Sequence, residues 1–284
     1  MIVSIVAAAC AMFGFSPTNA VAVDGWTLVW SDEFNKQGAP NPADWEYENG
    51  FVRNEEDQWY QPANAVCKGG NLVIEARREQ KPNPDYVPGS SDWRKNRANA
   101  QFTSASITTR GKHSWLYGRF EMRARIDTRP GMWPAFWTLG QDGEWPSNGE
   151  IDIMEYYRGN LLANVAWGSG KRWQAVWASN KFPLTDLNKT DKDWAKKFHI
   201  WRMDWTAEAI KLFVDNRLLN EVPLERAINV GSNGVSPFKQ PHYMILNLAI
   251  GGANGGNPDN TTFPGKFEVD YVRVYQQTST TAQP

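Results

Sequence analysis

The sequence predicts an all-β protein, folded as a two-sheet antiparallel β-sandwich of the β-jelly-roll type. Three observations predict this class. Apolar and polar residues alternate in many short runs, as they do in half-buried strands. Clusters rich in Gly, Pro, Asn and Ser separate these runs. Strand-like and helix-like runs do not alternate along the chain, which argues against a parallel βαβ fold.

Four runs show the alternation most clearly, at residues 72–77, 118–126, 210–215 and 267–275. In each run every second side chain is apolar, so we expect one face of each strand to lie on the core. No internal repeat or interdomain linker divides the chain. Residues 23–277 are therefore predicted to form one domain.

The two ends of the chain differ from this domain. Residues 1–15 form an apolar run of about signal-peptide length, and small residues at 20–22 suit cleavage, so residues 1–22 are predicted to be an export signal. The protein is then expected to be secreted or periplasmic. Cys10, which follows three alanines, offers lipoprotein anchoring as the alternative. No membrane-spanning segment is predicted, and the polar residues 278–284 are expected to be a disordered tail.

Charge and aromatic content narrow the class of partner. The 284 residues include 30 Lys and Arg against 31 Asp and Glu, a formal net charge of -1. So small a net charge gives no long-range attraction for nucleic acid or an anionic membrane, so we expect a neutral partner. The protein is expected to be a monomer. The chain also has 15 Trp, whose rings suit half-apolar, half-wet sites such as sugar clefts.

Three carboxylates lie within six residues of an apolar run, at Glu150, Asp152 and Glu155. Charged side chains rarely enter an apolar strand unless they are paired or functional. In a regular strand, Glu155 would face away from the other two carboxylates. A one-residue bulge at Ile153–Met154 would place all three on one face.

Two glutamates that lean toward each other can bring their carboxyl groups to about 5 Å, the separation used in retaining glycoside hydrolysis. One carboxylate attacks the anomeric carbon, while the other donates a proton to the leaving oxygen. Asp152 between them would push their pKa values apart. A calcium cluster and an exposed acidic strand are the alternatives, although the apolar neighbours argue against free exposure. The spacing does not say which glutamate takes which role.

At these residues the sequence resembles glycoside hydrolase family 16, in its laminarinase-like branch with the bulged E-x-D-x-x-E motif. Further similar segments lie at residues 30–34 (WSDEF), 131–137 (GMWPAFW), 247–252 (NLAIGG) and 269–275 (VDYVRVY). The resemblance implies a concanavalin A-like jelly roll whose concave sheet binds polysaccharide. It also implies that Glu150 is the nucleophile, Glu155 the acid/base and Asp152 the residue that tunes the nucleophile. No cofactor is expected for catalysis.

Aromatic residues near the motif are candidates for stacking on sugar rings. Trp137 has a place in the core as its alternative role. The loop at 49–56 resembles one that laminarinases place at the non-reducing end of the cleft, with a solvated acidic loop as the alternative. The complete predicted substrate-binding set is Trp133, Trp137, Trp145, Asn49, Arg53, Glu56, Trp167 and Asn247.

The resemblance further implies a structural calcium ion on the convex face. Glu33, the carbonyl group of Gly70 and Asp270 match the positions that hold it. The alternative is that Asp270 only caps a hydrogen bond of its strand.

The predicted function is an exported, retaining endo-hydrolase of β-1,3-glucan (laminarin-type) or mixed-linkage β-1,3-1,4-glucan. One alternative is a marine galactan hydrolase of the agarase, porphyranase or carrageenase type, because residues 163–167 lack a histidine found in many laminarinases. Basic rim residues would also suit sulfate, or form a merely solvated rim. These are Arg94, Lys95, Arg97, Arg158, Lys171 and Arg172. A lectin-like carbohydrate-binding module is the alternative from another class, which two opposed glutamates argue against.

Overall fold

The computed structural model describes residues 22, 23 and 25–277. One large sheet contains nine strands: β1 Ala22–Val23, β2 Trp26–Asp32, β5 Ala65–Lys68, β6 Asn71–Ala76, β11 Gly118–Arg125, β16 His199–Trp205, β17 Ala209–Val214, β18 Arg217–Pro223 and β20 Gly265–Gln277. The other contains seven: β3 Glu46–Tyr47, β10 Ser106–Thr108, β12 Met132–Gly140, β13 Glu150–Tyr157, β14 Asn160–Gly168, β15 Ala175–Pro183 and β19 His242–Ile250.

The remaining elements are short. Two small ladders pair β4 Gln58–Tyr60 with β9 Phe102–Ser104 and β7 Lys81–Pro82 with β8 Asn99–Ala100. The helices are α1 Leu184–Asn188 and α2 Gly252–Gly255, with 3-10 turns η1 Pro62–Asn64, η2 Trp194–Lys196 and η3 Pro237–Lys239.

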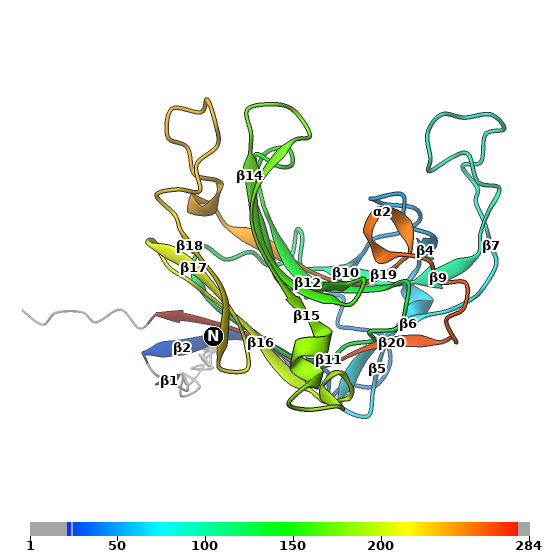
Figure 1. Cartoon of the computed structure of the whole chain (residues 1–284), viewed down its shortest axis with the longest axis horizontal. Helices are drawn as coiled ribbons and strands as arrows, with labels where there is room; N and C mark the ends of the chain where they lie inside the picture. Colours follow the sequence, from blue (N-terminus) through cyan, green and yellow to red (C-terminus); the bar gives the residue numbers. More distant parts are fainter. Residues whose placement is uncertain (1–21, 24, 278–284) are drawn as a thin grey trace, which may run out of the picture.

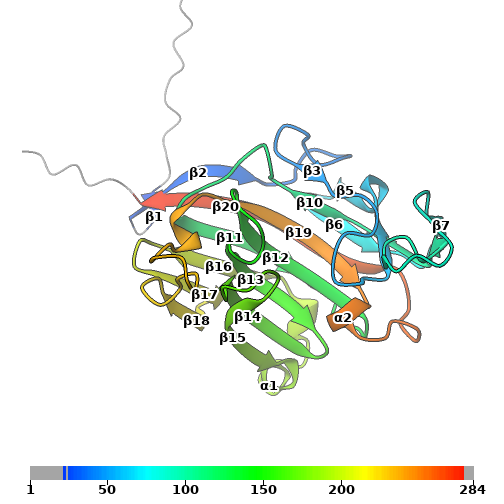
Figure 2. The same ribbon diagram turned by 90° about the horizontal axis from the view of Figure 1, so that it is seen from above.

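The two large sheets stack face to face (Figure 1), which confirms the predicted all-β sandwich. The nine-stranded sheet runs β1-β2-β20-β11-β16-β17-β18, with β6 paired to β20 and β5 to β6. The seven-stranded sheet runs β15-β14-β13-β12-β19-β10-β3, an order that is visible from above in Figure 2. All pairs within both sheets are antiparallel. In the seven-stranded order, β15 is an edge strand and β13 lies between β14 and β12.

The core fills the space between the sheets. The four runs predicted from alternation are strands β6, β11, β17 and β20. Strands β11 and β17 bury alternate side chains throughout, while Val73 in β6 and the neighbours Tyr271 and Val272 in β20 break the alternation. From β11, for example, Phe120, Met122 and Ala124 are fully buried in the core. Strands β12 and β19 are buried on nearly every residue, including those of β12 that line the cleft described below. These buried central strands provide a rigid floor for the outer face of the seven-stranded sheet.

The predicted export signal and tail lie outside the described residues, except that Ala22 pairs with Thr27 in the ladder between β1 and β2. Strand β20 ends at Gln277, where the predicted domain ends. Cys67 is buried with a free thiol, as expected for an apolar core residue. Within residues 25–277 and the pair 22–23, no helix is long and apolar enough to cross a membrane.

Candidate active site

The three carboxylates lie on strand β13, which has the predicted bulge. Asp152 pairs with Asn164 of β14, and the next paired residue, Glu155, pairs with Leu162. Two residues of β13 therefore oppose one residue of β14, and the register against β12 breaks at the same place. Both intervening side chains are fully buried in the core. The bulge thus turns Glu155 to the same side as Asp152 and Glu150.

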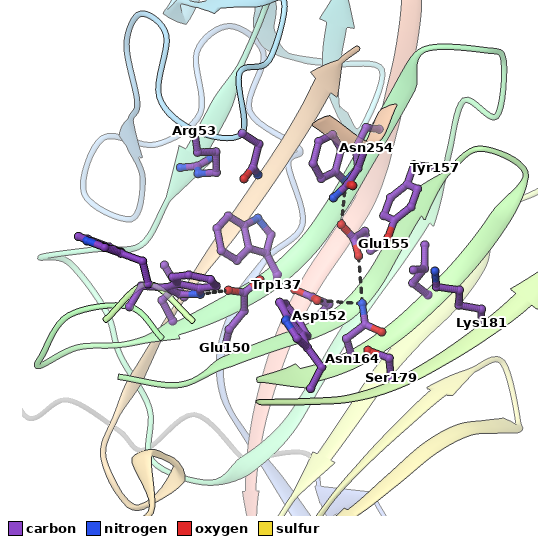
Figure 3. Close-up of a pocket in the computed structure, with 17 residues that line it drawn as sticks. Arg53, Trp137, Glu150, Asp152, Glu155, Tyr157, Asn164, Ser179, Lys181 and Asn254 are labelled. Carbon is purple, nitrogen blue, oxygen red and sulfur yellow. Dashed lines mark hydrogen bonds between the residues drawn. The ribbon is translucent and has the colours of Figure 1, made fainter. Parts of the chain in front are cut away.

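All three carboxylates line a cleft of about 590 Å³ on the outer face of β12 to β15. Figure 3 shows them on its floor, with the loop that carries Arg53 on one side and the edge strand β15 on the other. Lining residues are Arg53, Asn54, Trp133, Trp137, Leu139, Trp145, Glu150, Asp152, Glu155, Tyr157, Leu162, Asn164, Trp173, Trp177, Ser179, Lys181 and Asn254.

Each glutamate accepts a hydrogen bond from a tryptophan indole. Trp133 donates from Nε1 to Oε1 of Glu155 over 2.7 Å, and Trp145 donates from Nε1 to Glu150. Trp133 is only 5% exposed, so most of its ring is packed rather than free to stack on a sugar. Both rings were predicted as stacking platforms; their observed contacts also hold the two carboxylates in place.

Asn164 bridges the other side of the carboxylate group. Its Nδ2 donates to Oδ2 of Asp152 and to Oε2 of Glu155, over 3.1 Å in each case (Figure 3). The side chain is 4% exposed, and its Oδ1 has no hydrogen-bond partner among the described residues. This residue was not among the predicted site residues. Its contacts follow from the β13–β14 register, which the sequence does not specify.

Burial raises the pKa of all three carboxyl groups. For Glu155 the pKa rises to about 7, with the indole N–H of Trp133 acting in the opposite direction and the charge of Glu150 adding to the rise. The pKa of Asp152 rises well above its ordinary value because of burial and the neighbouring carboxylates. Hydrogen bonds from Trp145 and Asp152 counteract the rise in the pKa of Glu150. Burial and the neighbouring carboxylates thus favour the protonated form of Asp152, and burial favours the protonated form of Glu155 below about pH 7.

Four other predicted substrate residues lie beside the cleft. Arg53 lines it, pairs with Glu48 and places its guanidinium 5.0 Å from the centre of the Trp137 ring. Trp137 lines the cleft, although it is 7% exposed, and donates from Nε1 to Oδ1 of Asn247 over 2.7 Å. Asn247 and the buried Glu56 lie in an adjoining recess. This recess is also lined by Glu150, Asp152 and Glu155, so both predicted residues lie beside the carboxylates.

Two predictions of position are wrong. Trp167 was expected to bind substrate, but it is 8% exposed and packs in the core. Side chains an odd number of positions apart on a strand point to opposite faces. Asn164 faces the cleft, so Trp167, three positions further along β14, faces the core. Asn49 is exposed and donates to the carbonyl group of Tyr47, outside the cleft lining.

The sequence analysis missed the residues of strand β15. Trp177, Ser179 and Lys181 alternate along this strand and all line the cleft, together with Trp173 from the preceding loop. The period-two pattern W-x-S-x-K was the available signal. It indicated a strand but not that the strand would be the edge of the catalytic sheet.

The predicted calcium residues have other partners. Both oxygens of Glu33 accept hydrogen bonds from Arg273 at 2.8 Å, and Asp270 pairs with Arg123 at 2.6 Å. In the described part of the chain, no group of three or more His, Cys, Asp or Glu side chains is arranged to hold a metal ion. The side chains do not fit calcium as they stand. An ion would have to displace guanidinium groups or use backbone oxygens such as that of Gly70.

Two glutamates on one face of a strand, at the floor of an aromatic cleft, are the arrangement that glycoside hydrolases use. The chain belongs to the glycosyl hydrolases family 16, whose model matches residues 55–273. It is 38% identical to the Beta-glucanase of Rhodothermus marinus over 94% of this chain and 90% of that protein. The structure of the laminarinase from Rhodothermus marinus covers 89% of this chain and 98% of its own, at 37% identity and a TM-score of 0.72.

A third similarity is to a structure reported for endo-acting O-glycanases that gut bacteria use to initiate mucin breakdown. It is 32% identical, with a TM-score of 0.82, and the match covers 92% of this chain and 94% of that one. Structures with titles that name more than one substrate class therefore resemble this chain at similar identity.

Proposed function

We propose that this protein is an exported endo-β-glucanase that cleaves β-1,3-glucan or mixed-linkage β-1,3-1,4-glucan with retention of anomeric configuration. The observation that carries the proposal is the bulge of β13, which turns Glu150, Asp152 and Glu155 into one cleft. The names of the Rhodothermus marinus relatives support the glucan substrate.

In the first step Glu150 attacks the anomeric carbon, and Glu155 gives its proton to the departing glycosidic oxygen. A pKa of about 7 keeps Glu155 protonated in mildly acidic and neutral solution, as a general acid requires. Asp152 donates a hydrogen bond to Glu150 and so disperses its negative charge until attack begins. Asn164 and Trp133 hold Glu155 in a fixed rotamer beside the leaving oxygen.

In the second step Glu155, now ionised, takes a proton from water, and the water oxygen attacks the glycosyl-enzyme carbon. The bond to Glu150 breaks and restores its carboxylate. Two inversions return the β configuration. The two glutamates supply the chemistry of both steps, and a structural calcium ion stays a prediction.

Reducing-sugar release from laminarin, lichenan, agarose, porphyran and a mucin glycan tests the substrate class. We expect rapid release of a ladder of oligosaccharides from laminarin or lichenan. Cleavage of agarose or porphyran alone would establish the galactan alternative. Cleavage of mucin glycan alone would favour the mucin breakdown reported for the O-glycanases. Binding of any of these polymers without cleavage would favour the lectin-like alternative.

Export is tested separately, by N-terminal sequencing of protein recovered outside the cytoplasm. We expect a mature chain that begins near Val23. A full-length chain retained in the cell would contradict export, and a lipid attached at Cys10 would establish the anchored alternative.

A further inference from the structure

The basic residues predicted at the cleft rims are mostly engaged elsewhere. Arg172 pairs with Glu144 at 2.7 Å, and Arg97 lies 3.5 Å from a carboxylate oxygen of Asp57. Arg94 donates to a backbone carbonyl of the 49–56 loop over 2.9 Å. None of these arginines lines the cleft. The rim arginines therefore offer little free charge to a ligand in the cleft.

Lys181 differs from them. It lines the cleft, and no ion pair engages it in the described part of the chain. The other basic residue of the cleft lining is Arg53, which Glu48 neutralises on the opposite side. The charge of Lys181 acts on Glu155 and lowers its pKa, but no carboxylate of the described residues forms an ion pair with the ammonium group. It was absent from the predicted rim set, because its place on an edge strand depends on the sheet order.

Strand register gives the distance of Lys181 from the acid/base. Glu155 pairs with Leu162 across β13 and β14, and Leu162 pairs with Lys181 across β14 and β15. The three residues form one row across the sheet. With neighbouring strands about 4.8 Å apart, the Lys181 backbone lies roughly 10 Å from that of Glu155, about the length of two linked pyranose rings.

The same strand presents two more suitable groups. Ser179 lies in the row of Asp152 through Asn164, and Trp177 lies in the row of Glu150, with 45% of its surface exposed. Strand β15 therefore offers an indole ring for stacking, a hydroxyl group and an ammonium group on one face (Figure 3). Lys181 lies in the row of Glu155, which under the proposed function gives its proton to the leaving oxygen. We therefore place Lys181 on the leaving-group side.

We propose that Lys181 and its neighbours on β15 form a binding site for an anionic substituent, a carboxylate or a sulfate, on a sugar of the leaving-group side. The inference rests on the proposed function, since the proposed roles of the glutamates decide which side of the cleft holds the leaving group. An ammonium group that is free on a cleft wall attracts either anion, and the geometry of a point charge does not choose between them. The enzyme then prefers acidic over neutral β-glucan chains.

Binding is measured in the Glu150→Gln background, so that turnover does not consume the ligand. The probes are neutral, carboxymethylated and sulfated laminarin oligosaccharides of equal length, in 20 mM salt. We expect the anionic probes to bind about 5-fold to 10-fold more tightly than the neutral one. Adding Lys181→Met should remove this ratio, with the Kd of the neutral probe measured in each variant as the reference. Lys171→Met, on an exposed loop outside the cleft lining, is the matched control and should keep it.

Salt adds an independent readout, because a single exposed charge is screened within about 10 Å at 0.1 M and more strongly above it. The ratio should shrink toward one in 0.5 M salt for the Glu150→Gln background and the control only. Equal ratios with and without Lys181→Met would overturn the inference. A preference for one anion alone would identify it as the substituent. Failure of wild-type enzyme to cleave neutral laminarin, with the anion ratio intact, would refute the proposed function and leave the anion site standing.

Discussion

Replacing Glu155 by glutamine should stabilise the protein at alkaline pH. In the folded protein the pKa of this group is about 7, against an ordinary value of 4.5, because burial penalises the charged form. A raised pKa means that the folded state binds the proton more tightly, so this contribution to stability is complete below about pH 4.5. It is lost as the pH rises through 7. The difference of 7 minus 4.5, or 2.5 units, corresponds to about 3 kcal/mol at 1.36 kcal/mol per unit.

Glutamine removes the ionisation and keeps the shape. Its Oε1 can still accept from Trp133, and its amide NH2 replaces the Oε2–H of the protonated acid, so Asn164 faces a donor there in both proteins. We expect wild type and Glu155→Gln to have similar free energies of unfolding at pH 5. At pH 8.5 the variant should be more stable by about 2 to 3 kcal/mol.

Urea denaturation at both pH values measures this difference, with Glu225→Gln as an exposed control that should show no such gain. If Glu155→Gln shows the same pH dependence as wild type, the buried, protonated state of Glu155 is wrong. The general-acid assignment would then lose its physical basis.

Four further outcomes test the site. Glu150→Gln should lose nearly all turnover and keep oligosaccharide binding. A kcat above a tenth of the wild-type value, which is a barrier change of only ~1.4 kcal/mol, would exclude Glu150 as the nucleophile. Asn164→Leu removes two hydrogen bonds to carboxyl groups, so kcat/KM should fall at least about tenfold; an unchanged value would show that Asn164 positions nothing. Trp133→Phe keeps an aromatic ring but removes the N–H that lowers the pKa of Glu155. The alkaline limb of the kcat/KM pH profile should therefore move to higher pH, and an unchanged limb would refute that contact. Structural calcium requires a lower Tm in EDTA that added calcium restores, and an unchanged Tm would exclude it.

The sequence predicted the bulge because the spacing of the three carboxylates conflicts with a period of two, and only an extra residue reconciles them. It did not predict Asn164 or Lys181, since both reach Glu155 through cross-strand register, which depends on the pairing of whole strands. The error at Trp167 has the same origin. Without the register, neither face of β14 can be assigned to the cleft.

The convex face shows a second limit of sequence reasoning. Glu33 and Arg273 are 240 positions apart in the chain and form a two-hydrogen-bond ion pair. A carboxylate with a strong cationic partner competes poorly for a metal ion, but no local pattern in the sequence reveals such a partner. The burial of Trp133 was not predicted for a similar reason, because Gly255, which packs against it, lies far away in the sequence.

Azide rescue of Glu155→Ala tests the retaining mechanism most directly. With an activated aryl β-glycoside, departure of the leaving group needs no proton, so Glu150 should still form the glycosyl-enzyme. Without Glu155 to activate water, azide can occupy the vacated space and attack the anomeric carbon. We predict faster turnover in azide and a β-glycosyl azide as the product, identified by NMR. An α-glycosyl azide, or no rescue in a folded variant that still releases the aryl group, would contradict the roles of Glu150 and Glu155.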